Sequence, residues 1–552
     1  MAAGTAEDSG SRGVQAYYGF AIKAVGYLVL LGVAWFSLRL YQVRTKVRQA
    51  GKVPGVFFIP HSFLFGHLGV ITKLAIKLKS PPTLHGQMMP LLLARKYPEV
   101  MEAGVVYMDI WPISPPLFAV FRPDMMAQFT QDQSQPKHPF VVREMMPFTG
   151  AMDLASSEGQ EWKVGRSMFN PGFSLKNLLS LVPAFVEEVM VFRRRLGELA
   201  DKKETVKMEN YTTDLTVDII GRAVLGARIE AQKKPVKFMD AMVGQVAMLY
   251  FNNDLQKMLN PLIPIRHWIL NRTFHNEMMP YIQATVRNYE KMEGPKTILA
   301  LALKSYVTEV DASARGHIPP AFLNRVVNHI KMFLFAGHDT TATTLAYAYY
   351  ELSRNPAKLA RLRAELDDVL GTDPEQAAPR IAADPALLNQ LPYTLGVVKE
   401  TLRLWPVVGT VRNGSAGFTL LHPDTGIRYL TDGWVLFGCS KAAHVNPNFW
   451  SEPEAFLPER FTTRDERDPL HPVKNAFRPW EMGPRNCIGQ ELASLELRLV
   501  LALTVREFDM EPAFSESSES FQGEKAFQVQ LKEMITAHPN EGMPMTIRRA
   551  GV

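Results

Sequence analysis

A nearly uninterrupted apolar segment near the N-terminus, residues 16–38, most constrains what this chain can fold into. A helix needs about 20 such residues to cross the hydrocarbon core of a bilayer. Lys23 is the only formal charge in the segment, and a lysine near a helix end can reach the headgroups. The segment therefore predicts one transmembrane helix at 16–38, after a short tail at 1–15.

The charges that flank this segment predict its orientation, because basic residues stay on the cytosolic side of a membrane. The tail carries Glu7, Asp8 and Arg12, whereas five basic residues follow the segment: Arg39, Arg44, Lys46, Arg48 and Lys52. We expect the bulk of the chain to face the cytosol, joined to the anchor by a stiff linker at 39–60 that contains Pro54, Gly55 and Pro60. A cleaved signal peptide is the alternative, but no basic leader or small-residue cleavage site is clear.

The composition of the chain excludes several classes of protein. Apolar residues make up 47% and charged residues 21%, which is typical of globular chains. The net charge of +6 is spread along the sequence with no basic stripe among aromatic residues, so we expect no nucleic-acid binding. Only two cysteines are present, Cys439 and Cys487, which argues against a disulfide-rich secreted protein and a structural zinc site. Any special role for a cysteine must therefore be that of a single thiolate.

Beyond residue 60 the periodicity predicts a mainly α-helical domain, residues 61–552, with small β-sheets. The longest helix begins at Pro319-Pro320 and ends near Arg354, before Asn355-Pro356. Shorter helices are expected near 357–370, 392–404 and 489–508, two hairpins at 105–121 and 418–430, and a solvated loop at 512–526. Cys439 lies in a strand-like run and is expected in the core.

The stretch from Trp480 to Ala493 carries the strongest chemical signal. Cys487 stands at the start of an apolar helix, where free amides and the helix dipole favour a thiolate. Gly483 and Gly489 permit a tight loop that can approach a flat ligand closely, and Arg485 adds positive charge. Taken alone, the stretch is equally consistent with a buried free cysteine in a turn before a helix.

The same stretch resembles the haem-binding loop of the cytochrome P450 family, Phe-x-x-Gly-x-Arg-x-Cys-x-Gly. Gly483, Arg485, Cys487 and Gly489 all match, and Trp480 replaces the usual phenylalanine. The resemblance implies the cytochrome P450 fold and a haem b whose iron takes Cys487 as its axial ligand.

Further motifs follow in the order expected of this family. Glu400-Thr401-Leu402-Arg403 resembles the Glu-x-x-Arg motif, and residues 456–461 resemble the Pro-Glu-Arg-Phe segment. Glu400 and Arg403 share one helix face, and the resemblance adds Arg460 to them as a buried charge triad with a structural role. Such a triad can fix the register of the haem-binding region.

The long helix contains Ala336-Gly337-His338-Asp339-Thr340-Thr341, which resembles the oxygen-binding motif of the family. The resemblance implies a groove at Ala336 and Gly337 for the cofactor and dioxygen. It also implies that Thr340 organises a water beside the oxygen and that Asp339 relays protons. A local helix bulge is expected here, with His338 structural. The alternative is an ordinary helix with a polar turn.

The resemblance also implies which side chains neutralise the haem propionates, a task suited to the arginine fork. Trp162 and Arg166 stand four apart on one helix face and resemble the family's Trp-x-x-x-Arg pair, and Arg412 and Arg485 occupy the other propionate positions. His444, in a turn, is expected to be structural rather than a ligand.

The implied activity is a monooxygenase that hydroxylates, epoxidises or desaturates a lipophilic small molecule, by similarity to fungal members that act in secondary-metabolite biosynthesis. Expected substrate contacts are the 137–155 loop, Phe335, Ala336, Thr340 and Val407–Thr410. No Gly-x-Gly occurs, and only residues 488–552 follow Cys487, too few for a fused flavin domain.

We therefore expect electrons from NADPH through a separate NADPH-cytochrome P450 reductase, with cytochrome b5 as a further partner, at the endoplasmic reticulum membrane. The expected docking contacts are Lys474, Arg478 and Arg498. Two alternatives remain open. One is a reductase-independent haem-thiolate isomerase or dehydratase, which the intact Asp339-Thr340 pair disfavours. The other is a non-catalytic membrane-tethered binding protein.

Overall fold

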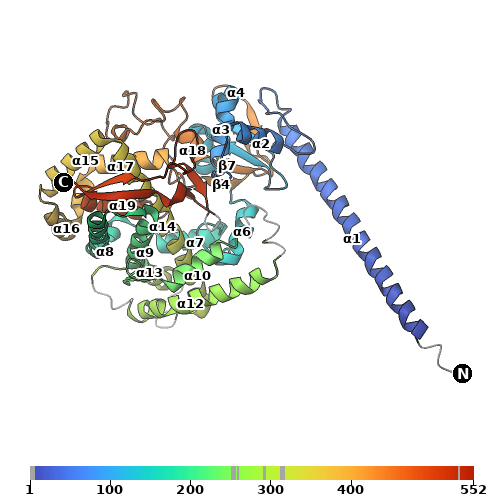
Figure 1. The fold of residues 1–552 in the computed structure, drawn as a ribbon, viewed down its shortest axis with the longest axis horizontal. Coiled ribbons are helices and arrows are strands. Elements are labelled where there is room, and N and C mark those ends of the chain that lie inside the picture. The colour runs from blue at the N-terminus through green and yellow to red at the C-terminus, as the bar shows by residue number, and fades with distance from the viewer. Residues whose placement is uncertain are drawn as a thin grey trace.

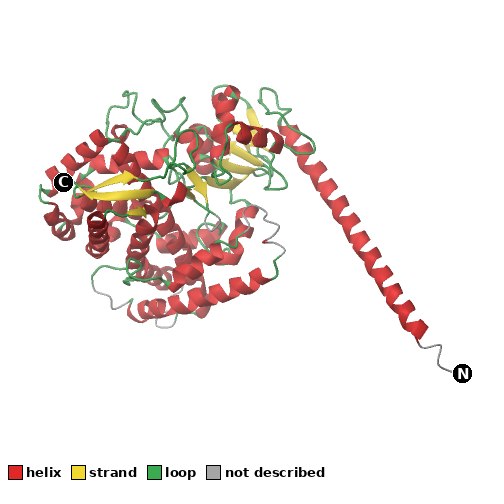
Figure 2. Ribbon diagram, viewed as in Figure 1, coloured by secondary structure: helices red, strands yellow, loops and turns green. Residues whose placement is uncertain are grey.

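Helices make up most of the backbone, and small sheets lie beside them (Figure 2). The computed structural model describes residues 7–249, 257, 260–289, 294–310, 318–531 and 535–551. Residues 1–6 of the predicted tail lie outside this part of the chain. The mainly α-helical class predicted from the sequence is confirmed. The longer helices are α1 Glu7–Ala50, α2 Leu68–Lys77, α3 Met88–Lys96, α6 Pro139–Thr149, α7 Gly159–Phe169, α8 Leu175–Lys202, α9 Met208–Leu225, α10 Lys237–Val246, α12 Leu262–Asn288, α13 Ile298–Ser305, α14 Pro320–Arg354, α15 Pro356–Leu370, α16 Pro374–Ala383, α17 Pro392–Leu404 and α19 Gln490–Thr504.

Short helical elements connect these helices. They are α4 Pro98–Ala103, α5 Pro123–Ala127, α18 Ser440–His444, the π-helical turns η1 Gln128–Asp132 and η2 Tyr306–Val310, and the 3₁₀ turns η4 Pro385–Gln390, η5 Pro458–Phe461 and η6 Asn540–Gly542.

Helix α1 projects from the globule as a single rod (Figure 1). Its segment Phe20–Ala50 is the only described helix long and apolar enough to cross a membrane. The helix does not stop at Leu38. Residues 39–50, expected in the linker, continue it, and Leu40, Val47 and Ala50 are buried against the globule. The apolar side chains of its C-terminal end explain the extension, because helical spacing turns them toward the domain.

Helix α14 crosses the domain and has the predicted bounds, starting at Pro320 and ending before Asn355-Pro356. It packs closely on α9, where a Cβ on Gly337 would lie 3.0 Å from Ile220. Two hydroxyls of α9 strengthen the contact, as Thr216 donates to His338 O (3.0 Å) and Thr212 donates to Ala342 O (3.1 Å). The position of α14 in the domain is therefore fixed by both shape and hydrogen bonds.

The sheets are small, and both predicted hairpins are confirmed. One sheet has the order β1-β2-β7-β4, in which β1 and β2 are antiparallel and β2 and β7 are parallel. The others have the orders β5-β6, β3-β11-β8 and β10-β9. The strands are β1 Val105–Met108, β2 Leu117–Val120, β3 Thr205–Lys207, β4 Thr410–Asn413, β5 Thr419–Leu421, β6 Arg428–Leu430, β7 Val435–Gly438, β8 Phe508–Pro512, β9 Gln528–Gln530, β10 Ala537–Pro539 and β11 Pro544–Arg549.

The last predicted helix is shorter than its apolar pattern indicated. Helix α19 ends at Thr504 rather than near 508, because Phe508 already pairs with Arg549 of β11. The 512–526 segment forms no long element, but Phe521 and Ala526 within it are buried, so this loop is only partly solvated.

Candidate functional site

The loop before α19 holds Cys487 in a fixed turn. The Cys487 amide donates to Trp480 O (2.8 Å). This hydrogen bond closes the loop that runs from Trp480 to Cys487. Gly483 has a φ of +87°, and a Cβ there would lie 2.1 Å from Thr130 O. Only glycine fits this position, because the backbone of η1 passes directly against it. The glycine of the motif thus has a steric cause.

Burial and the neighbouring hydrogen-bond donors and charges shift the pKa of the Cys487 thiol in opposite directions. The pKa of the Cys487 thiol is raised, contrary to the thiolate preference expected at this position, because burial outweighs the amides of Gly489 and Gln490 and the nearby Arg166, which lower it. Protein surrounds the side chain, yet it remains accessible, so it faces an internal space. Gly489 leaves room beside the sulfur, since a Cβ there would lie 3.8 Å from Sγ. Cys439 by contrast is buried in the core and donates to Gln87 O, as predicted.

Cys487 offers a single ligand atom, so it suits a metal ion whose other ligands belong to a cofactor. No cluster of three or more His, Cys, Asp or Glu that could hold a metal ion is found among the described residues. A single accessible cysteine just before a helix would fit as the thiolate ligand of a haem iron.

Arg412 and Arg485 supply buried donors for anionic groups. Arg412, on β4, is fully buried, and only its Nη1 bonds, to Thr410 Oγ1 (2.9 Å) and Val411 O (3.0 Å). Its Nε and Nη2 and the Nη1 of Arg485 have no hydrogen-bond partner. Burial lowers the pKa of Arg412 to about 10. Orphaned guanidinium donors fit the carboxylates of a haem, because leaving them unpaired is costly.

Lys137 joins these cations, and its only signal in the sequence is its place in the 137–155 segment, expected to be a loop, which instead forms α6 over Pro139–Thr149. Its side chain is half-buried, but protein surrounds the ammonium group, and this burial lowers its pKa well below the usual range. Arg412 and Arg485 lower it further, which places the three cations close together. A cluster of cations that depress one another's pKa favours an anionic ligand.

Trp162 and Arg166 both lie on α7 but have different partners. The Arg485 guanidinium stacks over the Trp162 ring at 4.5 Å, and Arg485 also pairs with Glu158. Arg166 donates to Asn486 O (2.8 Å) and Asn486 Oδ1 (2.9 Å). Arg166 thus braces the residue before Cys487, whereas a role toward a propionate remains a prediction for it.

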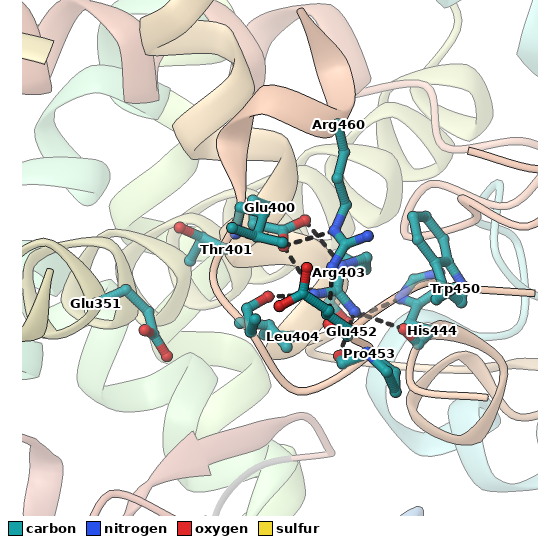
Figure 3. Close-up of polar contacts among 12 residues, drawn as sticks. Glu351, Glu400, Thr401, Arg403, Leu404, His444, Trp450, Glu452, Pro453 and Arg460 are labelled. Atoms are coloured by element: carbon teal, nitrogen blue, oxygen red, sulfur yellow. Dashed lines mark hydrogen bonds and ion pairs between the residues drawn. The ribbon is translucent and has the colours of Figure 1, made fainter. Parts of the chain in front are cut away.

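Glu400, Arg403 and Arg460 form the expected triad, and all three are essentially inaccessible (Figure 3). Arg403 donates to both carboxylate oxygens of Glu400 (2.8 and 2.7 Å), and Arg460 Nε donates to Glu400 Oε1 (3.2 Å). The remaining Arg403 donors reach the carbonyls of His444, Pro453 and Ala455. The triad therefore holds the irregular segment after α18 against α17.

His444 extends this network to the Cys487 loop. Its Nδ1 donates to Arg403 O (3.1 Å), and its Nε2 accepts from the Arg478 amide (3.0 Å). Both bonds require the neutral ring, and burial lowers the pKa of His444 to about 3. The turn role expected of His444 agrees with these bonds, but its link to Arg478 depends on contacts between distant segments and had no sequence signal.

The motif on α14 is partly accessible, whereas the residues on either side of it, 329–335 and 341–352, are buried. Ala336 is exposed and Gly337 and Thr340 are half-buried, while their neighbours Phe335, His338 and Asp339 are buried. The expected bulge does not form: α14 is a continuous α-helix through the motif, although Thr340 Oγ1 donates to Ala336 O (2.8 Å). His338 Nδ1 donates to Leu334 O (2.7 Å), and the residue is structural, as expected. Phe335 packs edge-on against Phe148.

Two of the three expected docking residues were wrongly placed on the surface. Arg478 is buried and bonds to Thr130 Oγ1 (2.6 Å) and Glu481, and Arg498 is buried and donates to Leu388 O (2.7 Å). Only Lys474 of the three is exposed. Both charges are used internally, because Arg478 pairs with the Glu481 carboxylate and Arg498 satisfies buried backbone carbonyls.

The comparisons with known proteins agree with this geometry. A family model described as Cytochrome P450 matches residues 94–536. The chain is 36% identical over 533 residues to the cytochrome P450 monooxygenase polC of Polytolypa hystricis, covering 95% of each chain. It is 33% identical over 506 residues to the cytochrome P450 monooxygenase acrF of Aspergillus aculeatus, covering 86% of this chain and 99% of that one.

Among solved structures, the crystal structure of a cytochrome P450 (CYP102L1) shares the fold, with a TM-score of 0.67 and 20% identity. That match covers 86% of this chain and 96% of the other. The family match covers most of the chain, and Cys487, Arg485 and the α14 motif lie within the matched residues. The chain therefore belongs to the cytochrome P450 family of haem-thiolate oxidoreductases.

Proposed function

We propose that this chain is a membrane-anchored monooxygenase that uses dioxygen and electrons from NADPH to oxidise a lipophilic small molecule. The observation that carries the proposal is Cys487. It is a single accessible thiol at the start of α19, beside cationic side chains with unpaired donors. The fungal relatives of this chain, polC and acrF, are named monooxygenases, which supports the same reaction class here.

The residues present fit a haem b. Cys487 would ligate its iron, and Arg412, Arg485 and Lys137 would hold its propionates, with Trp162 and Arg166 bracing Arg485 and the loop. Gly483 and Gly489 keep the loop clear of side chains, and Ala336 and Gly337 do the same on α14. When bound, the haem supplies the redox chemistry that activates dioxygen, which a thiolate ligand favours.

Asp339 and Thr340 would manage protons at this site. Thr340 is the accessible hydroxyl on α14, and its bond to Ala336 O holds it in one rotamer while leaving its oxygen free to accept. Asp339 is buried beside it and can hold a proton away from bulk water. The apolar side chains nearby, among them Phe335 and the exposed Val408, favour a lipophilic substrate.

Electrons would come from a separate NADPH-cytochrome P450 reductase, and cytochrome b5 is a second candidate partner. Lys474 and Lys163 are exposed cations for docking. Lys163 lies one turn from Arg166 on α7, and Arg166 contacts Asn486 directly before Cys487, so a partner at Lys163 would approach the sulfur side. Acidic partners suit such a surface.

The membrane would be that of the endoplasmic reticulum, with the globule in the cytosol. Helix α1 supplies the span. Helix α12, along the lower edge of the globule in Figure 1, carries a second apolar face of Leu262, Ile265, Trp268 and Ile269, each at least 50% exposed. Arg266 and Arg272 lie on the same helix, and exposed apolar side chains beside cations are typical of a membrane surface contact.

The test compares the full chain with Cys487→Ser and with Cys439→Ser, the control at the other cysteine. Each is expressed in microsomes with the reductase and given a panel of lipophilic metabolites. We expect the wild type and Cys439→Ser to show the red-shifted Soret band of the ferrous carbonyl form and NADPH-dependent products by mass spectrometry. Cys487→Ser should lose both. A colourless wild type would refute the proposal, and turnover that needs no NADPH would indicate the isomerase or dehydratase alternative.

A further inference from the structure

A buried chain of polar groups leads from Asp339 toward the surface. Thr536 donates through its hydroxyl to Asp339 Oδ2, and His538 Nε2 lies 2.9 Å from Thr536 Oγ1 and 3.4 Å from Asp339 Oδ1. His538 Nδ1 lies 2.7 Å from Glu209 Oε1. These contacts join α14, the hairpin strand β10 and the start of α9, three elements far apart in the sequence.

The burial of these groups differs along the chain. The side chains of His538 and Asp339 are each 4% exposed, whereas that of Glu209 is 11% exposed and forms the outer end. Thr343 also donates to Glu209 Oε1 (2.9 Å), which holds that carboxylate toward His538. An imidazole between two carboxylates, with its two nitrogens facing opposite ways, is arranged to take a proton at one nitrogen and release it at the other.

We propose that His538 passes protons from Glu209 to Asp339 through the Thr536 hydroxyl, and so sets the proton supply at Thr340. This inference rests on the proposed oxygen chemistry. In the transfer, the O–H bond of protonated Glu209 breaks as an N–H bond forms at Nδ1. The Nε2–H proton then moves to Thr536 Oγ1 while the Thr536 proton moves to Asp339. One proton has gone inward, Glu209 is left as a carboxylate, and the ring is neutral again.

The charges around the ring support this role. Burial lowers the pKa of His538, but Asp339 and Glu209 outweigh it, so the pKa is raised above its ordinary value. The other titratable groups that act on the ring are His338 of α14 and His85, which precedes α3. A raised pKa keeps the ring able to hold a proton at neutral pH, and proton supply should fall as pH rises through that value.

The first arm of the test needs no turnover. The full chain, with isotope-labelled histidines, is placed in lipid nanodiscs and titrated by NMR. The imidazole signal that is missing from the spectrum of His538→Gln is assigned to the His538 ring. We expect His538 to titrate above its ordinary pKa of about 6.5 and to shift down in Glu209→Gln. A ring that titrates below that value, or that ignores Glu209→Gln, would overturn the proposal.

The second arm follows NADPH consumption and peroxide release with the reductase. Thr536→Val and His538→Gln should slow NADPH consumption by roughly 10- to 100-fold and raise the peroxide share. Thr536→Ser, which keeps the hydroxyl, and His329→Gln, at another buried histidine of α14, should stay within about twofold of wild type.

Hydrogen peroxide brings its own protons, so guaiacol oxidation driven by peroxide should fall much less in Thr536→Val and His538→Gln than NADPH consumption does. Equal NADPH consumption and peroxide release in wild type, Thr536→Val and His538→Gln would refute the relay alone. A wild type that consumes no NADPH would instead refute the proposed function on which the relay rests.

Discussion

Arg44 of the anchor helix forms a buried ion pair with Asp109, which directly follows β1. Arg44 also donates to the carbonyls of Phe63, Leu64 and Trp111, and His61 Nε2 lies 2.9 Å from the other Asp109 oxygen. The C-terminal end of helix α1 is therefore built into the domain rather than joined to it by a free linker. Its direction relative to the globule is set by these bonds.

Arg44→Ala should destabilise this junction, because it leaves the Asp109 carboxylate buried without its arginine counter-charge, with only His61 and the Trp111 amide as partners. We expect a cost of about 3 kcal/mol in the free energy of unfolding and faster proteolysis within residues 51–60. Arg39→Ala, exposed on the same helix, is the control and should cost less than about 0.5 kcal/mol. Equal effects of the two variants in urea unfolding would contradict a structural junction.

Glu400→Gln should leave Arg403 and Arg460 as buried cations without a counter-charge. Breaking such a pair costs about 3–5 kcal/mol, and the Cys487 loop should loosen with it. Urea unfolding monitored by the thiolate Soret band measures this. Glu511→Gln removes an exposed partner of Arg548 and should cost at most about 1 kcal/mol. The role assigned to the triad fails if the buried variant is as mild as the exposed one.

Arg412→Leu should speed the loss of haem without destabilising the apoprotein. The substitution removes unpaired buried donors, so the apoprotein should be as stable as wild type or more so. Haem should leave roughly 10- to 100-fold faster, since each charged hydrogen bond contributes about 1.5–3 kcal/mol. Transfer of haem to apomyoglobin gives the rate, and Arg412→Lys should be intermediate because it keeps charge without the fork. Unchanged haem loss would remove Arg412 from the propionate site.

The lowered pKa of His444 predicts that the Cys487 loop is destabilised by acid. Its pKa is about 3 in the folded protein against about 6.5 unfolded, so the unfolded chain binds more protons between these values. Stability is therefore fully present above pH 6.5 and declines as the pH falls toward 3. His444→Phe should cost about 2–4 kcal/mol at neutral pH by losing both hydrogen bonds, and its unfolding free energy should depend less steeply on pH. An unchanged slope would assign the acid sensitivity to other buried histidines such as His67 and His85.

Charge reversal should reveal the docking surface. Lys163→Glu with Lys474→Glu should slow reduction by the reductase several-fold and weaken its dependence on salt, because exposed charges mainly steer association. Stopped-flow reduction at two ionic strengths measures both. Lys234→Glu, an exposed cation between α9 and α10, is the control. If all variants are reduced at the same rate, the partner docks elsewhere.

The sequence alone determined the features that depend on neighbouring residues. The bounds of α14, both hairpins and the Cys487 loop follow from local periodicity, proline positions and glycine spacing, and the apolar run at 16–38 predicted the apolar N-terminal helix but not its C-terminal end at Ala50. These patterns are reliable because the residues that cause the structure lie within a few turns of it.

Only the tertiary structure decided which distant side chains meet. It buried Arg478 and Arg498, turned Arg166 toward Asn486, brought Lys137 to Arg412 and lined up Glu209, His538 and Asp339. It also continued the anchor helix into the domain through Arg44. Such contacts join residues up to several hundred positions apart. No local pattern encodes them, because they arise when buried polar groups find partners during packing of the whole domain.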